Sequence, residues 1–301
     1  MSKTKTTLSL IRRNVKLFFA DKGMFFTSLV TPLILIMLFI TFLGQVYHDA
    51  FRSAIPEGIT VSGGLENAFV NGWLFSSLLG VCTVTVSFCS NLLMVQDKVN
   101  GSRGDLDVSP VPGSCLAVAY FAASAVSTLI ICLTAIFICF GILAFTGWYL
   151  SVSDAVLAII DTVLLVLFGT SLSSVISHFL STQGQMSAVG TIISSVYGFI
   201  CGAYMPISEF APAIRNLISL LPGTYGTALL HRHFMNGVYR ELDGIVPAPV
   251  LDGLKEAFDS KIALFGKIVP EWAMFLIIGL SVALLSTTYV IVSGRKTRRK
   301  K

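Results

Sequence analysis

Side chains that can hydrogen-bond recur on one face of a long apolar stretch, residues 68–95. Thr83, Ser87 and Asn91 are spaced four residues apart, which places them on the same face of a helix. In a membrane, such a face could line a route for a polar molecule, or it could hydrogen-bond to a neighbouring helix. The sequence leaves both interpretations open. The candidate pathway residues are Thr83, Ser87, Asn91, Thr191 and Ser195.

Few other side chains near the apolar stretches can ionise or bind a metal. Asp161 could be a functional acid at membrane depth, or it could mark the end of an apolar stretch. His231 and His233, together with His48, could bind a metal, but two histidines separated by one residue are also typical of polar residues at a membrane surface. We therefore expect no metal site.

The chain lacks the sequence motifs of common hydrolases. It has no Gly-x-x-x-x-Gly-Lys-Ser/Thr loop, the motif that cradles nucleotide phosphates, so ATP hydrolysis by that route is excluded. It also has no Gly-x-Ser-x-Gly or His-Glu-x-x-His motif, which leaves little support for a serine hydrolase or a metalloprotease.

The composition indicates that membrane helices position these residues. Hydrophobic residues make up 54% of the chain and charged residues 12%, and the mean hydropathy is +0.81. These values are typical of a membrane protein with several spans, each of which needs roughly 20 apolar residues. We predict an all-α fold in a single domain, residues 1–301, with six transmembrane helices at about 24–46, 68–95, 117–145, 156–178, 186–204 and 272–293.

The basic residues indicate the side of the membrane on which each end lies. Six Lys and Arg residues precede the first span and six follow the last, and such an excess is typical of cytoplasmic segments. We therefore expect a multi-pass protein of the cell membrane with both termini in the cytoplasm. Before the first span, an amphipathic helix is predicted to lie in the membrane surface, with an apolar face formed by Leu8, Ile11, Val15, Phe18 and Phe19.

Two segments outside the spans are long enough to have structures of their own. Residues 96–112 are the only substantial cytoplasmic connection, because the other, residues 181–185, is a short turn. The extracellular segment 205–271 contains an apolar helical face that starts near Pro212 and ends at Pro222. This face is too short to span, so we predict re-entrant helices between the fifth and sixth spans. A second apolar stripe in residues 251–265 could cover the bundle or recognise a substrate.

Two ordered motifs carry a resemblance to a known family. The cytoplasmic loop contains Asp97-Lys98, Gly101-Ser102, Leu106 and Ser109-Pro110-Val111. After the fifth span come Gly202-Ala203-Tyr204-Met205-Pro206, Pro212, Leu221-Pro222-Gly223-Thr224-Tyr225 and Gly237. With the six spans, this order resembles the permeases of type II ABC exporters, a class that includes bacterial drug and polysaccharide exporters. The loop departs from the family pattern at Arg103 and Gly104, so we expect its helix to be shortened or kinked.

The resemblance implies a transport subunit that is not itself an enzyme. In the family, the cytoplasmic loop forms a coupling helix that docks on separate ATPase subunits, and these bind ATP and Mg²⁺. Two permeases pair, as a homodimer or a heterodimer, and the route lies at the dimer interface near the second and fifth spans. By resemblance, the coupling residues are Asp97, Lys98, Gly101, Ser102, Leu106 and Pro110, and the outer motif is Pro206, Pro212, Pro222 and Tyr225.

The identity of the substrate stays open between a drug, a peptide, a lipid and a glycan. We expect the lipid bilayer and the ATPase as partners, no nucleic acid, and no cofactor on this chain. The alternative class is a membrane-embedded enzyme or assembly factor without an ATPase partner.

Overall fold

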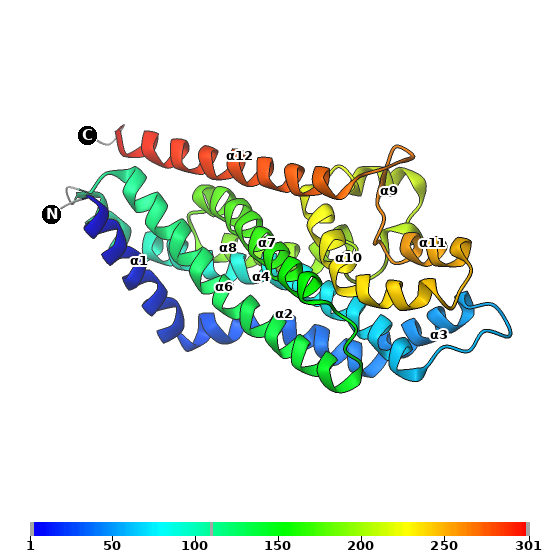
Figure 1. Ribbon diagram of the computed structural model, residues 1–301. Coiled ribbons are helices and arrows are strands. Elements are labelled where there is room, and N and C mark those ends of the chain that lie inside the picture. The colour runs from blue at the N-terminus through cyan, green and yellow to red at the C-terminus, as the bar shows by residue number, and fades with distance from the viewer. Residues whose placement is uncertain (1–2, 109–110, 299–301) are drawn as a thin grey trace.

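The computed structural model describes residues 3–108 and 111–298 as a bundle of long helices (Figure 1). The helical elements are α1 (Lys3–Ala20), α2 (Lys22–Leu38), η1 (Phe39–Leu43), α3 (Gly44–Ala54), α4 (Gly63–Val99), α5 (Ser102–Val108), α6 (Gly113–Thr146), α7 (Val152–Phe179), α8 (Gln183–Ile200), η2 (Ile207–Glu209), α9 (Pro212–Ile218), α10 (Pro222–Asp243), α11 (Ala248–Ala257) and α12 (Glu271–Arg298). Two short antiparallel strands, β1 (Ala263–Leu264) and β2 (Lys267–Ile268), form a hairpin before α12.

Five helical stretches are long and apolar enough to cross a membrane. They are Lys22–Ala54, Gly63–Val99, Gly113–Thr146, Val152–Phe179 and Glu271–Gly294, and they correspond to five of the six expected spans. The segment expected as the fifth span forms α8, which is not among these stretches. Its 18 residues begin Gln-Gly-Gln and include several hydroxyl side chains, which lowers its hydropathy. The chain is therefore an all-α membrane protein with several spans.

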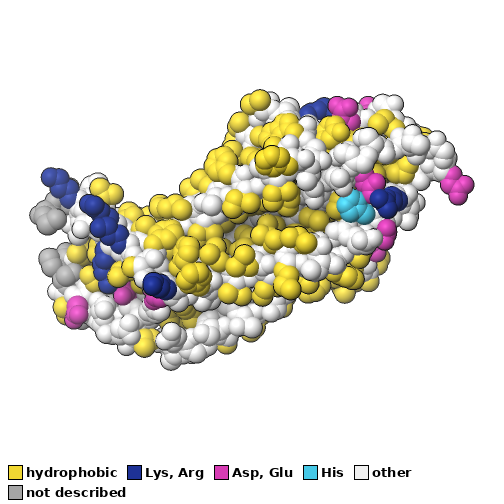
Figure 2. Space-filling model, turned by 90° about the horizontal axis from the view of Figure 1, so that it is seen from below, with side chains coloured by type: hydrophobic (Ala, Val, Ile, Leu, Met, Phe, Trp, Pro, Cys, Tyr) yellow, Lys and Arg dark blue, Asp and Glu magenta, His cyan; other side chains and the backbone are white. Residues whose placement is uncertain are grey.

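Side chains are distributed along the bundle as a bilayer requires. On the face that Figure 2 shows, hydrophobic side chains cover the middle of the molecule, and charged side chains gather toward its two ends. Lys and Arg dominate the end where α1 begins and α12 stops, and acidic and histidine side chains lie toward the other end. An apolar middle between charged ends fits a membrane protein whose long axis follows the bilayer normal.

The central element of the bundle is α4. It contacts α2, α6, α7, α8 and α10, and apolar or small residues occur on all of its sides, as expected for a buried helix. Near its start, the fully buried ring of Trp73 lies 4.2 Å from the ring of Tyr47, centroid to centroid. Phe258, which follows α11, packs edge-on against Trp73 and Phe69. These rings attach α3 and the segment after α11 to the end of α4.

The position of α10 depends on a close approach of two backbones. A Cβ atom on Gly237 would lie 2.0 Å from the carbonyl oxygen of Tyr149, a distance that no side chain could accept without a shift of the backbone. Glycine at this position lets α10 pack directly on the segment before α7.

The outer segment matches the sequence prediction in part. Pro212 lies in the first turn of α9, as predicted, whereas α9 already ends at Ile218 and Pro222 instead starts α10. On the predicted apolar face of α9, Leu217 is 65% exposed and only Ile218 is buried. Both η2 and α9 are short, and their entry into the membrane stays a prediction. In the second stripe, Leu251 and Leu254 on α11 are buried against the bundle, whereas α11 ends at Ala257 and Phe265 lies beyond it with 68% exposure, so the predicted helical stripe is shorter than expected.

Candidate coupling and pathway sites

The predicted coupling loop folds into a short helix at the end of α4. Gly101 has a φ of +81° and follows the C-cap residue Asn100, in the left-handed conformation that often ends a helix. Ser102 then begins α5, which has seven residues. The sixth predicted coupling residue, Pro110, lies outside the described residues.

Asp97 lies inside the protein and joins three helices. Its carboxylate accepts hydrogen bonds from Arg13 Nη1 at 2.9 Å and Nη2 at 3.3 Å, and from the Tyr120 hydroxyl at 2.5 Å. Asp97 is 5% exposed, and its partners lie on α1 and α6. The charge that the sequence suggested for contact with an ATPase is therefore used within the chain.

Lys98 also binds within the chain, at the end of α7. Its Nζ donates to the carbonyl oxygens of Ser177 and His178, both at 2.9 Å, and to that of Leu180 at 2.8 Å. The last carbonyls of a helix lack intrahelical donors and carry partial negative charge, so an ammonium group stabilises them. Asp97 and Lys98 thus attach the end of α4 to α1, α6 and α7.

The solvent-facing part of α5 consists of other residues. Leu106 is partly buried and packs against a cluster of buried side chains from α4, α6 and α12, which holds α5 on the bundle. Asp105 is exposed, and Val108 is 88% exposed. The sequence did not identify Asp105 and Val108 as candidates, because the loop motif contains the charges nearest the span instead.

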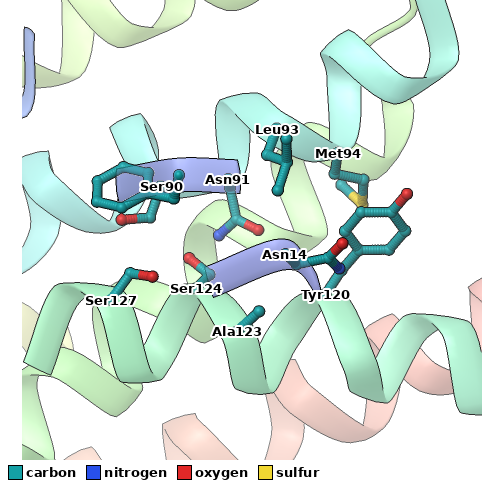
Figure 3. A pocket seen from close by; sticks show the side chains of 10 residues that line it. Asn14, Ser90, Asn91, Leu93, Met94, Tyr120, Ala123, Ser124 and Ser127 are labelled. Atoms are coloured by element: carbon teal, nitrogen blue, oxygen red, sulfur yellow. The ribbon is translucent and has the colours of Figure 1, made fainter. Parts of the chain in front are cut away.

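The face by which α1 packs on the bundle includes a polar side chain. Asn14 and Phe18 are each 1% exposed, and Asn14 points between α4 and α6 (Figure 3). The amide Nδ2 of Asn14 and the Oγ of Ser124 have no hydrogen-bond partner, and both residues line a cavity of about 10 Å³. That volume is close to what one water molecule needs and is far too small for a transported molecule.

The candidate pathway residues divide into two groups. Thr83, Ser87 and Asn91 are buried against α7: the Ser87 and Thr170 hydroxyls lie 3.3 Å apart, and Asn91 Nδ2 donates to Ser173 Oγ at 2.5 Å. The other two, Thr191 and Ser195, are exposed on α8. The structure does not bring the two groups together. In this conformation, the polar face of α4 packs against α7 and joins these two helices.

The outer motif is held together by hydrogen bonds to the backbone. The Tyr225 hydroxyl donates to the carbonyl oxygen of Ser219 at 2.5 Å. Directly after Pro206, the backbone N–H of Ile207 donates to Asp259 Oδ2 at 2.6 Å. Burial raises the pKa of Asp259 to about 7, although the hydrogen bonds that it accepts oppose this rise. Asp259 thereby connects the segment after α11 to the outer motif.

The three histidines considered for a metal site have separate environments. His48 Nδ1 lies 2.6 Å from Glu66, His231 Nε2 lies 3.0 Å from the Ser77 hydroxyl, and His233 lies beside Asp161. Within residues 3–108 and 111–298, no group of three or more His, Cys, Asp or Glu side chains is placed to hold a metal ion.

The family model described as "ABC-2 type transporter" matches residues 6–233, about three quarters of the chain. The chain belongs to this family. A comparison with curated proteins gave no match. As an ABC-2 family member, the protein is a membrane permease subunit of an ABC transporter, and the family implies association with ABC ATPase subunits. The match includes most of α1, the predicted coupling loop and the predicted outer motif, and it ends within α10, before α11, the hairpin and α12.

Proposed function

We propose that this ABC-2 permease is the membrane half of an ATP-driven exporter and crosses the membrane six times. In this topology α8 is the fifth span and both termini are cytoplasmic. Two observations support it. The start of α1 and the end of α12 lie at the same end of the bundle, as an even number of crossings requires (Figure 1). In addition, 18 helical residues extend for roughly 27 Å, close to the thickness of the bilayer core.

The junction at Asp97 and Lys98 is the observation that carries the proposal of coupling. A soluble ATPase subunit would bind the exposed side of α5, including Asp105 and Val108. Movement of α5 would reach α1 and α6 through Asp97 and the end of α7 through Lys98. ATP and Mg²⁺ would bind to the partner subunits, and this chain would convert their movement into a change of the bundle.

The pathway would form between two permeases rather than inside one. The hydroxyl and amide groups of the α4 face are occupied by α7, whereas Thr191 and Ser195 on α8 are exposed. Pairing through α8, with an identical or a related permease, would place these two side chains beside the partner. A drug, a peptide, a lipid or a glycan carrier remains within the proposed range of substrates.

Two sets of variants distinguish binding of the ATPase subunit from the coupling of its movement to transport. We expect Asp105→Ala with Val108→Ala to weaken co-purification with the ATPase subunit and to leave the thermal stability of the permease unchanged. Asp97→Asn should leave co-purification largely intact but reduce transport per ATP hydrolysed. Glu57→Ala, at an exposed position in the loop between α3 and α4, is the control that should change neither. Normal binding and normal transport in both sets would show that the coupling surface lies elsewhere.

The direction of transport requires its own measurement. In inside-out vesicles that contain the permease and its ATPase, ATP added to the medium should drive a labelled substrate into the lumen. Accumulation in right-side-out vesicles with enclosed ATP would instead indicate an importer.

A further inference from the structure

A row of side chains with alternating charge connects α10 to α7 and α12. His233 Nδ1 lies 2.5 Å from Asp161 Oδ2 on α7, and His233 Nε2 lies 3.3 Å from Glu271 Oε1 at the start of α12. The other oxygen of Glu271 lies 3.0 Å from Nε of Arg232. The order along this row is Arg232, Glu271, His233 and Asp161.

This row of four side chains leads from the surface into the bundle. The side chains of Arg232 and Glu271 are 43% and 33% exposed, whereas those of His233 and Asp161 are 3% and 0% exposed. The second carboxylate oxygen of Asp161 has no hydrogen-bond partner and is buried. A buried carboxylate is costly unless it is paired with a positive charge, so Asp161 favours a protonated His233.

The geometry at His233 also favours its charged form. Each ring nitrogen faces a carboxylate oxygen, and an imidazole ring donates a hydrogen bond at both nitrogens only when it is protonated. Burial lowers the pKa of His233, but the hydrogen bonds and charges of Asp161 and Glu271 outweigh this effect and raise it above the ordinary histidine value.

Three neighbouring features help to separate the effect of Asp161 and Glu271 on His233 from other influences. Arg240 and Asp154 lie toward the end of α10 and the start of α7, respectively, and their side chains are 2.7 Å apart, so this pair balances its own charge. From α12, the ring of Phe275 packs near the His233 ring and adds no charge. His231 is fully buried beside Ser77 and Trp73 with no carboxylate partner, and burial lowers its pKa to about 3.

We propose that His233 is a proton-binding site that exchanges with the aqueous phase along Glu271, and that its protonation strengthens the attachment of α12 to α10 and α7. When the site loses its proton, the proton leaves Nε2 past Glu271 to water and the electron pair stays on Nε2. The neutral ring still donates Nδ1–H to Asp161. Its Nε2 lone pair then faces the Glu271 carboxylate, which breaks this contact to α12. The aqueous phase is the outer one in the six-span topology, but the site does not depend on the direction of transport.

The proposal predicts different charge states for two histidines on one helix. The full chain, labelled with ¹⁵N-histidine in nanodiscs, is titrated by NMR between about pH 5 and 9, and signals are assigned by His233→Gln and His231→Gln. His233 should titrate above the ordinary value of about 6.5, and His231 should stay neutral throughout. Glu271→Gln should shift the His233 midpoint downward. A midpoint at or below 6.5, or one that Glu271→Gln leaves unchanged, would overturn the proposal.

A second measurement tests the link to α12. The melting temperature of the wild-type chain minus that of His233→Gln is followed over the same pH range, so that other titrating groups cancel. A raised pKa in the folded state stabilises it at low pH, and this contribution is lost as pH rises through the folded value. The difference should therefore fall with rising pH, and Glu271→Gln should reduce the fall. A constant difference would mean that His233 has only a packing role and would refute the proposed proton dependence.

Discussion

Replacing Arg13 and Asp97 singly and together would measure how strongly α1 is attached to α4. Arg13→Met keeps an apolar side chain of similar length. Asp97→Asn keeps an oxygen that can accept the Tyr120 hydroxyl. The double variant completes a thermodynamic cycle that isolates the two hydrogen bonds between the guanidinium and the carboxylate.

The exposure of the two side chains sets the expected magnitude. The hydrogen bonds are 2.9 and 3.3 Å long, and the side chains are 35% exposed for Arg13 and 7% exposed for Asp97. Exposed ion pairs contribute about 0.2–1 kcal/mol, and breaking a buried pair costs about 3–5 kcal/mol. Because the carboxylate is buried but the guanidinium is partly in water, we expect a coupling free energy of about 1–3 kcal/mol.

The assay is denaturant unfolding of the full chain in detergent micelles, followed by far-ultraviolet circular dichroism at low and high salt. The exposed pair Lys261 and Asp252, joined at 2.6 Å, serves as the control cycle and should show no measurable coupling at high salt. If the Arg13 and Asp97 effects add to within about 0.5 kcal/mol, the docking of α1 does not depend on this ion pair.

Three further outcomes follow from other contacts. Lys98→Met should lower the free energy of unfolding by about 2–4 kcal/mol, because three carbonyl oxygens lose a charged donor, whereas Lys16→Met on the exposed side of α1 should change it little. In the folded protein Asp259 keeps its proton up to about pH 7, whereas in the unfolded chain it releases the proton near pH 3.8. The free energy of unfolding of the wild type should therefore fall as pH rises from 3.8 to about 7, by on the order of 4 kcal/mol at most. If the free energy of unfolding changed with pH in the same way for the wild type and for Asp259→Asn, the raised pKa of Asp259 would be contradicted. In the six-span topology, Gln183→Cys should react with an impermeant thiol reagent from the cytoplasm and Glu209→Cys from outside, and labelling of both from one side would exclude α8 as a span.

The long apolar runs made most of the fold predictable from the sequence. Membrane helices form wherever about 20 apolar residues follow one another, and this rule gave five spans, including the single long helix α6. Pro212 marked the start of α9 because proline fits the first turn of a helix. The glutamines and hydroxyl side chains of α8 bring its hydropathy near the limit of this rule, and its place as the fifth span stays a prediction.

The sites were less predictable because their contacts join residues far apart in the chain. Arg13 and Asp97 are separated by 84 positions, and His233 and Asp161 by 72. A charge at the end of a span has the same sequence pattern whether it contacts a partner subunit or another helix of its own chain. Helical spacing similarly identified the polar face at Ser87 and Asn91 but could not show that α7 covers it.

At the end of α4, the two charges predicted to contact an ATPase bind other helices of the same chain. Successive residues of a helix point about 100° apart, so Asp97 and Lys98 hold different neighbours from one turn of α4. Beyond them, Gly101 separates α4 from α5, and the Arg103 guanidinium of α5 lies 5.6 Å from the centre of the Tyr120 ring, the residue that also donates to Asp97. A displacement of α5 therefore presses on the same tyrosine that helps to fix Asp97 and, through it, Arg13 on α1. In the proposed mechanism, a partner subunit that moved α5 would therefore reach α1 and α6 without touching Asp97, and a charge buried within the chain would still take part in coupling.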